Sequence, residues 1–340
     1  MSTTEVRVPP PARAPGRGQL AVPGGERLWA RVGWAVFALG IGLLAAFGAT
    51  TGQLGTLRVA TTVLMYVVLT EAWSVLGGFG GYLNFGMAMF FGVGAYTAAI
   101  VSNHAGIPPL ATVVACGAVA GILAVVVGIP SLRLRGAYFA IVTFVLTLAI
   151  QQLVSVLGIT NGALGLYLKP VSMSPRASLE LYFFIFLGGA VAATLLTRQL
   201  ARSRFGSALV AIREDEDAAE ILGIPTTRVK TLAFVLAAVI AGMVGCVYAS
   251  QLYYIEPTGT FDFAISLNVV VGAIVGGVQS WVGPLLGAGT TQLLSQELLT
   301  RTQGVEGNLV LGALLVLFAR FVPGGIVGVV RRRGGTKVTV

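Results

Sequence analysis

Long apolar runs separated by short charged clusters make up most of the chain. Ten of these runs are long enough to cross about 30 Å of hydrocarbon, if short or broken helices are allowed. They cover residues 32–50, 59–76, 86–103, 110–129, 136–157, 180–197, 231–250, 262–278, 284–300 and 307–322. The pattern predicts an all-α membrane protein of about ten transmembrane helices, with residues 32–322 as its transmembrane domain.

Two segments interrupt the helical pattern with glycine and proline. The first runs from Gly77 to Gly86 and the second from Gly272 to Gly287, where Pro284 also removes a backbone donor. Irregular backbone at membrane depth is tolerated where protein or a water-filled cavity satisfies it, so the pair indicates broken or re-entrant helices along a translocation pathway. Close helix packing through small residues explains the same glycines, and the sequence leaves both interpretations open.

The two ends of the chain lack this apolar pattern. Residues 1–31 are rich in Pro, Gly and Arg and predict a disordered cytoplasmic tail, and residues 323–340 predict a cytoplasmic C-terminal tail. The run at 32–50 is too long for the apolar region of a signal peptide, and further spans follow it. It is therefore interpreted as a retained first helix.

The positions of Lys and Arg predict the topology. With a cytoplasmic N-terminus, 18 of the 22 basic residues fall on the cytoplasmic side, in the first tail, at 133–135, at 198–230 and at 320–337. The remaining four are Arg58, Lys169, Arg176 and Arg301. Because short cytoplasmic loops are enriched in Lys and Arg, this split predicts a multi-pass protein of the inner (plasma) membrane with both termini in the cytoplasm.

Composition supports the membrane class and removes several others. The chain is 56% hydrophobic and 10% charged, whereas soluble globular proteins carry about 25% charged residues. Its net charge of +9 does not predict nucleic-acid binding, because the basic residues flank apolar runs instead of forming a stripe with aromatics. Cys116 and Cys246 lie inside apolar runs, where small buried hydrophobic residues are favoured over the alternative of a disulfide or metal pair.

Sites for catalysis or a bound metal are not predicted. His104 is the only histidine, so the chain lacks the set of His, Cys and carboxylate residues that a zinc site or a catalytic triad needs. No metal or resident cofactor is therefore expected. The spans carry no paired carboxylates and no nucleophile beside a base, so an intramembrane enzyme is not expected. The sequence also lacks a Walker phosphate-binding motif, so ATP would have to be hydrolysed by another subunit.

The polar stretch at 198–230 is the most informative part of the sequence. Five of the chain's 13 acidic residues fall within residues 214–220. One helical face, interrupted by Asp215, carries the apolar residues Ala208, Ile212, Ala219 and Leu222. Gly223 and Pro225 form a stop signal. The pattern predicts one short amphipathic cytoplasmic helix at 207–222, either a solvated connector or a docking element for a soluble partner.

Polar residues within the spans are candidates for a substrate pathway. Glu71 is the only acid well inside an early span, where a charge costs on the order of 3 kcal/mol, so it should face the bundle or a cavity. A packing hydrogen bond near the cytoplasmic end is favoured over a gating role for Glu71. The other candidates lie in or near the broken segments: Asn84, Gly86, Tyr96, Thr143 and Asn268.

Several motifs resemble one known family in the same order along the chain. The stretch from Ala208 to Ile224, followed by Lys230, is similar to the cytoplasmic loop of M-type permeases of branched-chain amino-acid ABC importers. The segments 86–97, 132–143, 276–288 and 320–325 are similar to other signatures of that family. The resemblance covers about residues 71–328 and implies that the loop is the coupling helix, which seats in a groove of the ATPase subunit. The coupling residues it implies are Ala208, Ala211, Ile212, Arg213, Glu214, Glu216, Ala219, Glu220 and Gly223.

The same resemblance implies the function and the partners. It implies a permease subunit that translocates branched-chain, small neutral amino acids across the membrane. The partners that it implies are a homologous permease subunit, two ATPase subunits that bind ATP, and an extracytoplasmic substrate-binding protein. Departures from the family pattern occur at Met87, at residues 160–165, at Ser207 and at Gln279. These departures leave an ABC permease for urea or short amides as an alternative. An autonomous secondary transporter or channel is the alternative from another class.

Overall fold

The computed structural model describes residues 40–51, 53–169, 173–278, 280–301 and 325. Eight longer helices are present in this part: α2 (Leu54–Ser74), α3 (Met87–Ala105), α4 (Val113–Ser131), α5 (Ala137–Val156), α6 (Pro175–Ala201), α9 (Thr226–Leu252), α11 (Phe263–Gly276) and α12 (Gly283–Arg301). They are joined by short elements: η1 (Val75–Phe79), η2 (Pro109–Thr112), η3 (Gly158–Thr160), η4 (Gly162–Leu164), β1 (Leu166–Tyr167), α7 (Arg204–Glu214), α8 (Glu216–Ile221), β2 (Tyr254–Ile255) and α10 (Pro257–Thr260). All contacts discussed below lie within the compact unit Phe47–Val340.

Six helical segments of the described residues are long and apolar enough to cross a membrane: Leu54–Phe79, Pro109–Ser131, Ala137–Val156, Pro175–Ala201, Thr226–Leu252 and Pro257–Gly276. The predicted class, an all-α membrane protein, is therefore confirmed, whereas the count of ten spans is not. The predicted spans 86–103 and 284–300 do form α3 and α12. Asn103 and His104 lower the apolar character of α3, and glycine, threonine and glutamine residues lower that of α12. Of the span 32–50, the helix Gly40–Thr50 is described; the span 307–322 and both predicted tails lie outside the described residues.

Helices α4 and α9 pack against each other in antiparallel directions through small residues. Three glycines of α4 face side chains of α9: Gly117 faces Met243, Gly121 faces Val239 and Gly128 faces Phe234. A Cβ at Gly121 would lie 2.8 Å from a Val239 methyl group, which shows how little space the interface leaves. Glycine in these spans therefore permits close helix approach, as is common in membrane proteins.

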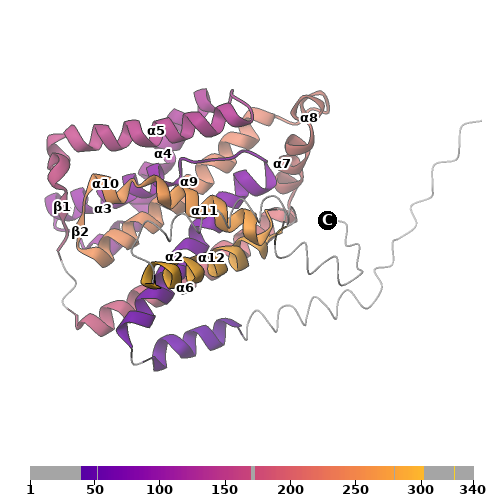
Figure 1. The fold of residues 1–340 in the computed structure, drawn as a ribbon. Helices are drawn as coiled ribbons and strands as arrows, with labels where there is room; N and C mark the ends of the chain where they lie inside the picture. Colours follow the sequence, from indigo (N-terminus) through magenta and orange to yellow (C-terminus); the bar gives the residue numbers. More distant parts are fainter. Residues whose placement is uncertain (1–39, 52, 170–172, 279, 302–324, 326–340) are drawn as a thin grey trace, which may run out of the picture. The chain divides into compact units, whose positions relative to one another are not determined.

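The helix bundle has two distinct ends (Figure 1). At the loop end, α4 and α6 finish, α5 and α9 begin, and α7 and α8 connect α6 to α9. At the ribbon end, β1 pairs with β2 in antiparallel register, Leu166 opposite Ile255 and Tyr167 opposite Tyr254. Basic residues are concentrated at the loop end, where Arg133, Arg135 and the stretch 198–230 lie.

Burial differs strongly among the apolar helices. In the most apolar window of the segment Leu54–Phe79, 72% of residues are buried inside the protein, against 28% for α5. The largest fully buried side chains include Trp73 of α2 and Phe90 and Phe91 of α3. Helix α2 therefore lies at the centre of the bundle, and α5 lies at its edge.

Candidate functional site

The polar loop between α6 and α9 folds as two helices, so the predicted single helix at 207–222 is wrong. Helix α7 ends at Glu214 and α8 begins at Glu216, because Asp215 adopts an extended conformation between them. The Asp215 carboxylate accepts hydrogen bonds from the amides of Asp217 and Ala218, both at 3.0 Å. Asp215 is thus the N-cap of α8, a position that aspartate favours because it satisfies amides with no partner inside the helix.

The predicted stop signal at the end of this loop is confirmed in detail. Gly223 has a φ of +83°, a left-handed conformation that glycine adopts at little cost. Its amide donates to the Glu220 carbonyl at 2.9 Å, and the Ile224 amide donates to the Ala219 carbonyl at 3.0 Å. This pair of bonds is the Schellman arrangement that closes helix C-termini.

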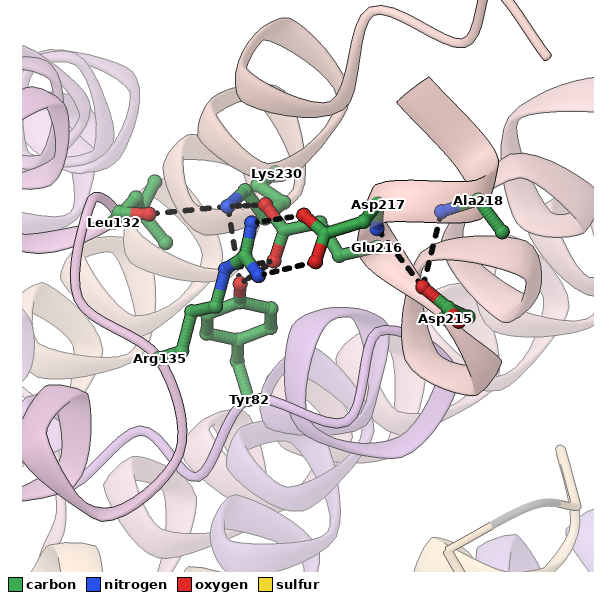
Figure 2. A network of polar contacts seen from close by, with 8 residues as sticks. All are labelled: Tyr82, Leu132, Arg135, Asp215, Glu216, Asp217, Ala218 and Lys230. Atoms are coloured by element: carbon green, nitrogen blue, oxygen red, sulfur yellow. Dashed lines mark hydrogen bonds and ion pairs between the residues drawn. The ribbon is translucent and has the colours of Figure 1, made fainter. Parts of the chain in front are cut away.

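Glu216 is the centre of a polar network that connects the loop to the bundle (Figure 2). Lys230 at the start of α9 donates to its Oε1, and the Tyr82 hydroxyl donates to its Oε2, each at 2.5 Å. Lys230 also donates to the Leu132 carbonyl that follows α4, at 3.0 Å. The side chains of Glu216 and Lys230 are only 13% and 4% exposed. One carboxylate therefore connects α8 to α9, to the segment before α3 and, through Lys230, to the end of α4.

Arg135, from the loop between α4 and α5, extends the network to the surface. Its two terminal nitrogens donate to the two carboxylate oxygens of Asp217 at 3.1 and 2.7 Å. Its Nε lies 3.4 Å from Glu216 Oε2. Two parallel bonds between a guanidinium and a carboxylate fix their relative orientation as well as their distance. The loop before α5 is therefore held against α8.

The network changes the acidity of its members. Burial alone would raise the pKa of the Glu216 carboxyl, but hydrogen bonds from Lys230 and Tyr82 and the nearby positive charges outweigh burial and lower it. Hydrogen bonds from Arg135 lower the pKa of Asp217, and the same pairing raises the pKa of the Arg135 guanidinium. Burial, followed by the bond to Glu216, raises the pKa of the Tyr82 hydroxyl. Both carboxylates are therefore held in their charged form.

The structure corrects two expectations about which loop residues face solvent. Glu216 lies outside the predicted apolar face, but it is mostly buried because it pairs with Lys230. Leu222 was expected on the packed face, but it is 80% exposed, and Ile221 is 86% exposed. The other predicted coupling residues follow no single face: Ile212 and Ala219 are buried, Ala208, Ala211 and Arg213 are half-buried, and Glu214, Glu220 and Gly223 are exposed.

Helix α7 contacts the first interrupted segment directly. Arg213 donates to the Gly78 carbonyl at 3.3 Å and pairs with Glu214 at 2.7 Å. Gly81 has a φ of +73°, and a Cβ there would collide with the Arg213 side chain. Leu209 packs beside Gly80, where a Cβ would lie 3.3 Å from its methyl group. Gly80 and Gly81 thus make room for the face of α7.

The two interrupted segments predicted from glycine and proline meet in the structure. The first contains the π-helical turn η1, and the second separates α11 from α12. A Cβ at Gly78 would lie 2.5 Å from the Val278 carbonyl oxygen, so the two backbones are in contact. Arg213 therefore reaches one interruption, which in turn touches the other.

Glu71 lies beside the second interruption. Its side chain is fully buried, and the Thr194 hydroxyl donates to its Oε1 at 3.4 Å. Thr197 of α6 and the backbone of Leu285, in the first turn of α12, lie close to this carboxyl group. Amides of a first helical turn have no partner inside their helix, and negative groups are stabilised beside them. Glu71 therefore connects α2 and α6 to the start of α12.

The other predicted pathway residues fall into separate places. Asn84, Gly86 and Thr143 come together: Asn84 accepts from the Gly86 amide at 2.8 Å, and Thr143 accepts from the Phe85 amide at 3.1 Å. Asn268 instead lies beside Tyr66 of α2. Tyr96 is buried, and its ring lies 5.8 Å from that of Phe261. Three of the five residues therefore belong to one cluster at the start of α3.

Sequence reasoning missed the partners that make Glu216 a structural centre. Tyr82, Arg135 and Lys230 come from three segments far apart in the chain, and no local pattern pairs them with the loop. One signal was available: Lys230 directly precedes the apolar run 231–250, where an unpaired buried ammonium would be costly. Among the described residues, no group of three or more His, Cys, Asp or Glu could hold a metal ion.

Long apolar helices, two meeting interruptions and a polar loop bound to the helix ends define a multi-pass integral membrane protein of the all-helical class. Residues 55–319 match the family described as branched-chain amino acid transport system / permease component, and the chain belongs to this family.

Individual relatives agree with the family. The chain is 29% identical to the high-affinity branched-chain amino acid transport system permease protein LivM of Salmonella typhimurium, over 82% of this chain and 71% of the relative. It is 28% identical to LivM of Escherichia coli K12 over the same shares. The autoinducer 2 import system permease protein LsrC of Salmonella paratyphi B is 28% identical over 46% of this chain and 51% of the relative. No solved structure matches the chain.

Proposed function

We propose that the chain is the transmembrane subunit of an ABC importer for branched-chain, small neutral amino acids, driven by ATP hydrolysed in partner subunits. The observation that carries the proposal is the loop of α7 and α8, which bears exposed apolar side chains and is tied to both interruptions and to α9. The partners are a homologous permease subunit, two ATPase subunits and an extracytoplasmic binding protein. The complex lies in the inner membrane, with the loop end in the cytoplasm.

The docking surface for the ATPase is the exposed end of α8. Ile221 and Leu222 are exposed at the end of α8, directly after the exposed acid Glu220 and one turn after Asp217. A cytoplasmic loop gains nothing in folding from two exposed large apolar residues. In an interface, apolar anchors contribute most of the affinity, and the surrounding charges set encounter and orientation.

Movement of α8 would be passed to the bundle through charged contacts. A shift of Glu216 would displace Lys230 and with it the start of α9. A shift of Asp217 would displace Arg135 and with it the start of α5. Arg213 passes the same motion to Gly78 and so to the contact with Val278. Interrupted helices can change their packing at such points with few broken hydrogen bonds. ATP-driven closure of the ATPase subunits would thereby open or close the pathway.

The decisive experiment changes the docking surface without touching the network. The double variant Ile221→Asp, Leu222→Asp replaces two exposed side chains, so the free energy of unfolding should change by no more than about 0.5 kcal/mol per site. Co-purification of ATPase subunits and ATP-dependent uptake should both be lost. The matched control is Leu164→Asp, which alters an apolar residue of similar exposure at the ribbon end and should leave both intact. Normal co-purification with the double variant would overturn the docking assignment.

The substrate class is tested separately. The cluster at Asn84, Gly86 and Thr143 offers backbone groups, an amide and a hydroxyl with no fixed charge, which suits a small neutral side chain. Cells that lack this subunit should take up less labelled leucine, isoleucine and valine. Unchanged uptake of all three, with a loss of urea or acetamide uptake, would replace the amino-acid assignment with the amide one.

A further inference from the structure

The two cysteines of the chain lie against each other inside the bundle, although they are 130 positions apart in the sequence. Cys116 is in the first turns of α4, Cys246 is near the end of α9, and both are fully buried. The Cys246 thiol donates to the Pro109 carbonyl at 3.3 Å. The Thr112 hydroxyl lies 3.5 Å from the Cys116 sulfur and 3.6 Å from the Cys246 sulfur. The two sulfur atoms therefore share one polar environment at the ribbon end.

The helix backbones are close enough for a covalent bridge. One turn before Cys246, a Cβ at Gly242 would lie 2.9 Å from the Cys116 carbonyl oxygen and 2.5 Å from Ala120 Cβ. A disulfide requires Cα atoms about 4.4–6.8 Å apart, a separation found only where helices approach this closely. Both sulfur atoms lie within 3.6 Å of the same Thr112 hydroxyl oxygen, so side-chain rotations can bring them together. Because α4 and α9 are antiparallel neighbours, the bridge would join two backbones that are already in close contact.

We propose that Cys116 and Cys246 are a reversible disulfide site that joins α4 to α9. A peroxide, small and uncharged, is the class of oxidant that can enter this buried site. One thiol attacks the peroxide oxygen, the O–O bond breaks, and a sulfenic acid and one water result. The second sulfur then attacks the sulfenic sulfur and displaces a second water. The two thiols lose two electrons and two hydrogens, and hydrogen peroxide is reduced to two waters.

The bridge would join the ribbon ends of two helices whose loop ends are already joined. At the loop end, Lys230 of α9 donates to the Leu132 carbonyl after α4 at 3.0 Å. With the disulfide in place, the pair is held at both ends and can move only as one body. Dithiol reductants would restore the thiols by exchange, since that reaction needs only access of a thiolate to the bridge.

The test counts thiols in the purified full-length protein. After treatment with hydrogen peroxide and denaturation, a maleimide-linked polyethylene glycol should add to neither cysteine, whereas the untreated protein should carry two labels. The oxidised chain should remain a monomer on a non-reducing gel, and dithiothreitol should return both labels. Peptide mass spectrometry should find the segments around Cys116 and Cys246 linked, with the loss of two hydrogen atoms. The oxidised form should also unfold several degrees higher, as expected for a bridge that closes a long loop.

Single variants supply the control. Cys116→Ser and Cys246→Ser each keep a small polar group beside Thr112, so the fold should persist, and each should carry one label before treatment. After treatment these variants cannot form the intramolecular bridge, so no linked peptide and no rise in unfolding temperature should appear. The proposal is overturned if both wild-type thiols remain labelled, if their loss is accompanied by covalent dimers, or if dithiothreitol fails to restore them.

Discussion

At the scale of single residues, the pairing of Glu216 with Lys230 is the most consequential contact of the loop. Replacing both members of a buried ion pair by apolar groups is often neutral, whereas removing one leaves an uncompensated charge. Lys230 is the more buried partner and keeps only the Leu132 carbonyl and the Tyr82 hydroxyl when Glu216 is lost. Glu216, which the sequence analysis gave only as a coupling residue, is therefore also a structural residue.

The first prediction concerns this pair. Glu216→Gln should lower the free energy of unfolding by about 3 kcal/mol, because Lys230 then remains buried with no opposing charge. Glu220→Gln, an exposed acid four positions further on, should change it by less than about 0.5 kcal/mol. Thermal unfolding in detergent measures both. A double variant, Glu216→Leu with Lys230→Met, should lose less than the sum of the two single changes. Equal, small effects of the two glutamine variants would contradict the buried pair.

The second prediction concerns pH. The pKa of Glu216 is lower in the folded protein than its ordinary value of 4.5, so the folded state binds fewer protons below that value. The contribution of the pair to stability should be complete above about pH 4.5 and should disappear as the pH falls through the lowered folded pKa. Unfolding midpoints measured from pH 7 down to pH 3.5 should therefore drop less steeply for Glu216→Gln than for the wild type. Parallel curves for the two proteins would show that Glu216 titrates normally.

At the scale of elements, the two interruptions act together because their backbones touch. Gly78 belongs to η1, and its missing side chain lets the chain after α11 approach. The glycines of both segments therefore serve close packing, and the same contact places irregular backbone of both segments in one region. The two interpretations that the sequence left open are compatible at this position.

The third prediction compares two glycines. Gly78→Ala should destabilise the protein by about 1–3 kcal/mol, because the new methyl group would collide with the Val278 carbonyl oxygen and overpacking has this cost. Gly188→Ala in α6 is the control: nothing lies within 4 Å of its Cβ position, and alanine favours a helix. Thermal unfolding of the two variants should move in opposite directions. A neutral Gly78→Ala would mean that the segments do not pack at this point.

At the scale of the whole molecule, the positions of the charges and the helix directions agree. The loop end carries Arg133, Arg135 and the stretch 198–230, and the ribbon end carries Arg58, Lys169 and Arg176. Because Lys and Arg remain on the cytoplasmic side of spans, the loop end is expected in the cytoplasm. This orientation places the exposed end of α8 where ATPase subunits are found.

The fourth prediction tests this orientation. In a background of Cys116→Ser and Cys246→Ser, Ala163→Cys at the ribbon end should react with a membrane-impermeant maleimide on whole cells. Ser207→Cys at the loop end should react only after the cells are opened, and both positions are exposed in the structure. Ser172, the other natural choice, lies outside the described residues. Equal labelling of both cysteines on intact cells would invert or abolish the proposed topology.

The sequence by itself determined the features that depend on neighbouring residues. Apolar periodicity and length located the helices to within a few residues, and Gly223 marked the end of α8, because helices and caps are stabilised by contacts a few positions apart. Even here a local rule was overlooked: Asp215 was placed inside one helix, although aspartate favours the N-cap that it occupies. Local chemistry was therefore nearly sufficient for the elements.

Only the tertiary structure decided which distant groups became partners. Lys230 is 14 positions from Glu216 but 148 from Tyr82, and Gly78 is 200 positions from Val278. These contacts arise from helix packing, and many different packing arrangements would bury a similar apolar area. Packing likewise brought Cys116 to Cys246, which composition alone had classified as unconnected hydrophobic residues. The polar network and the thiol pair thus depend on three-dimensional proximity, because no period in the sequence relates residues on separate helices.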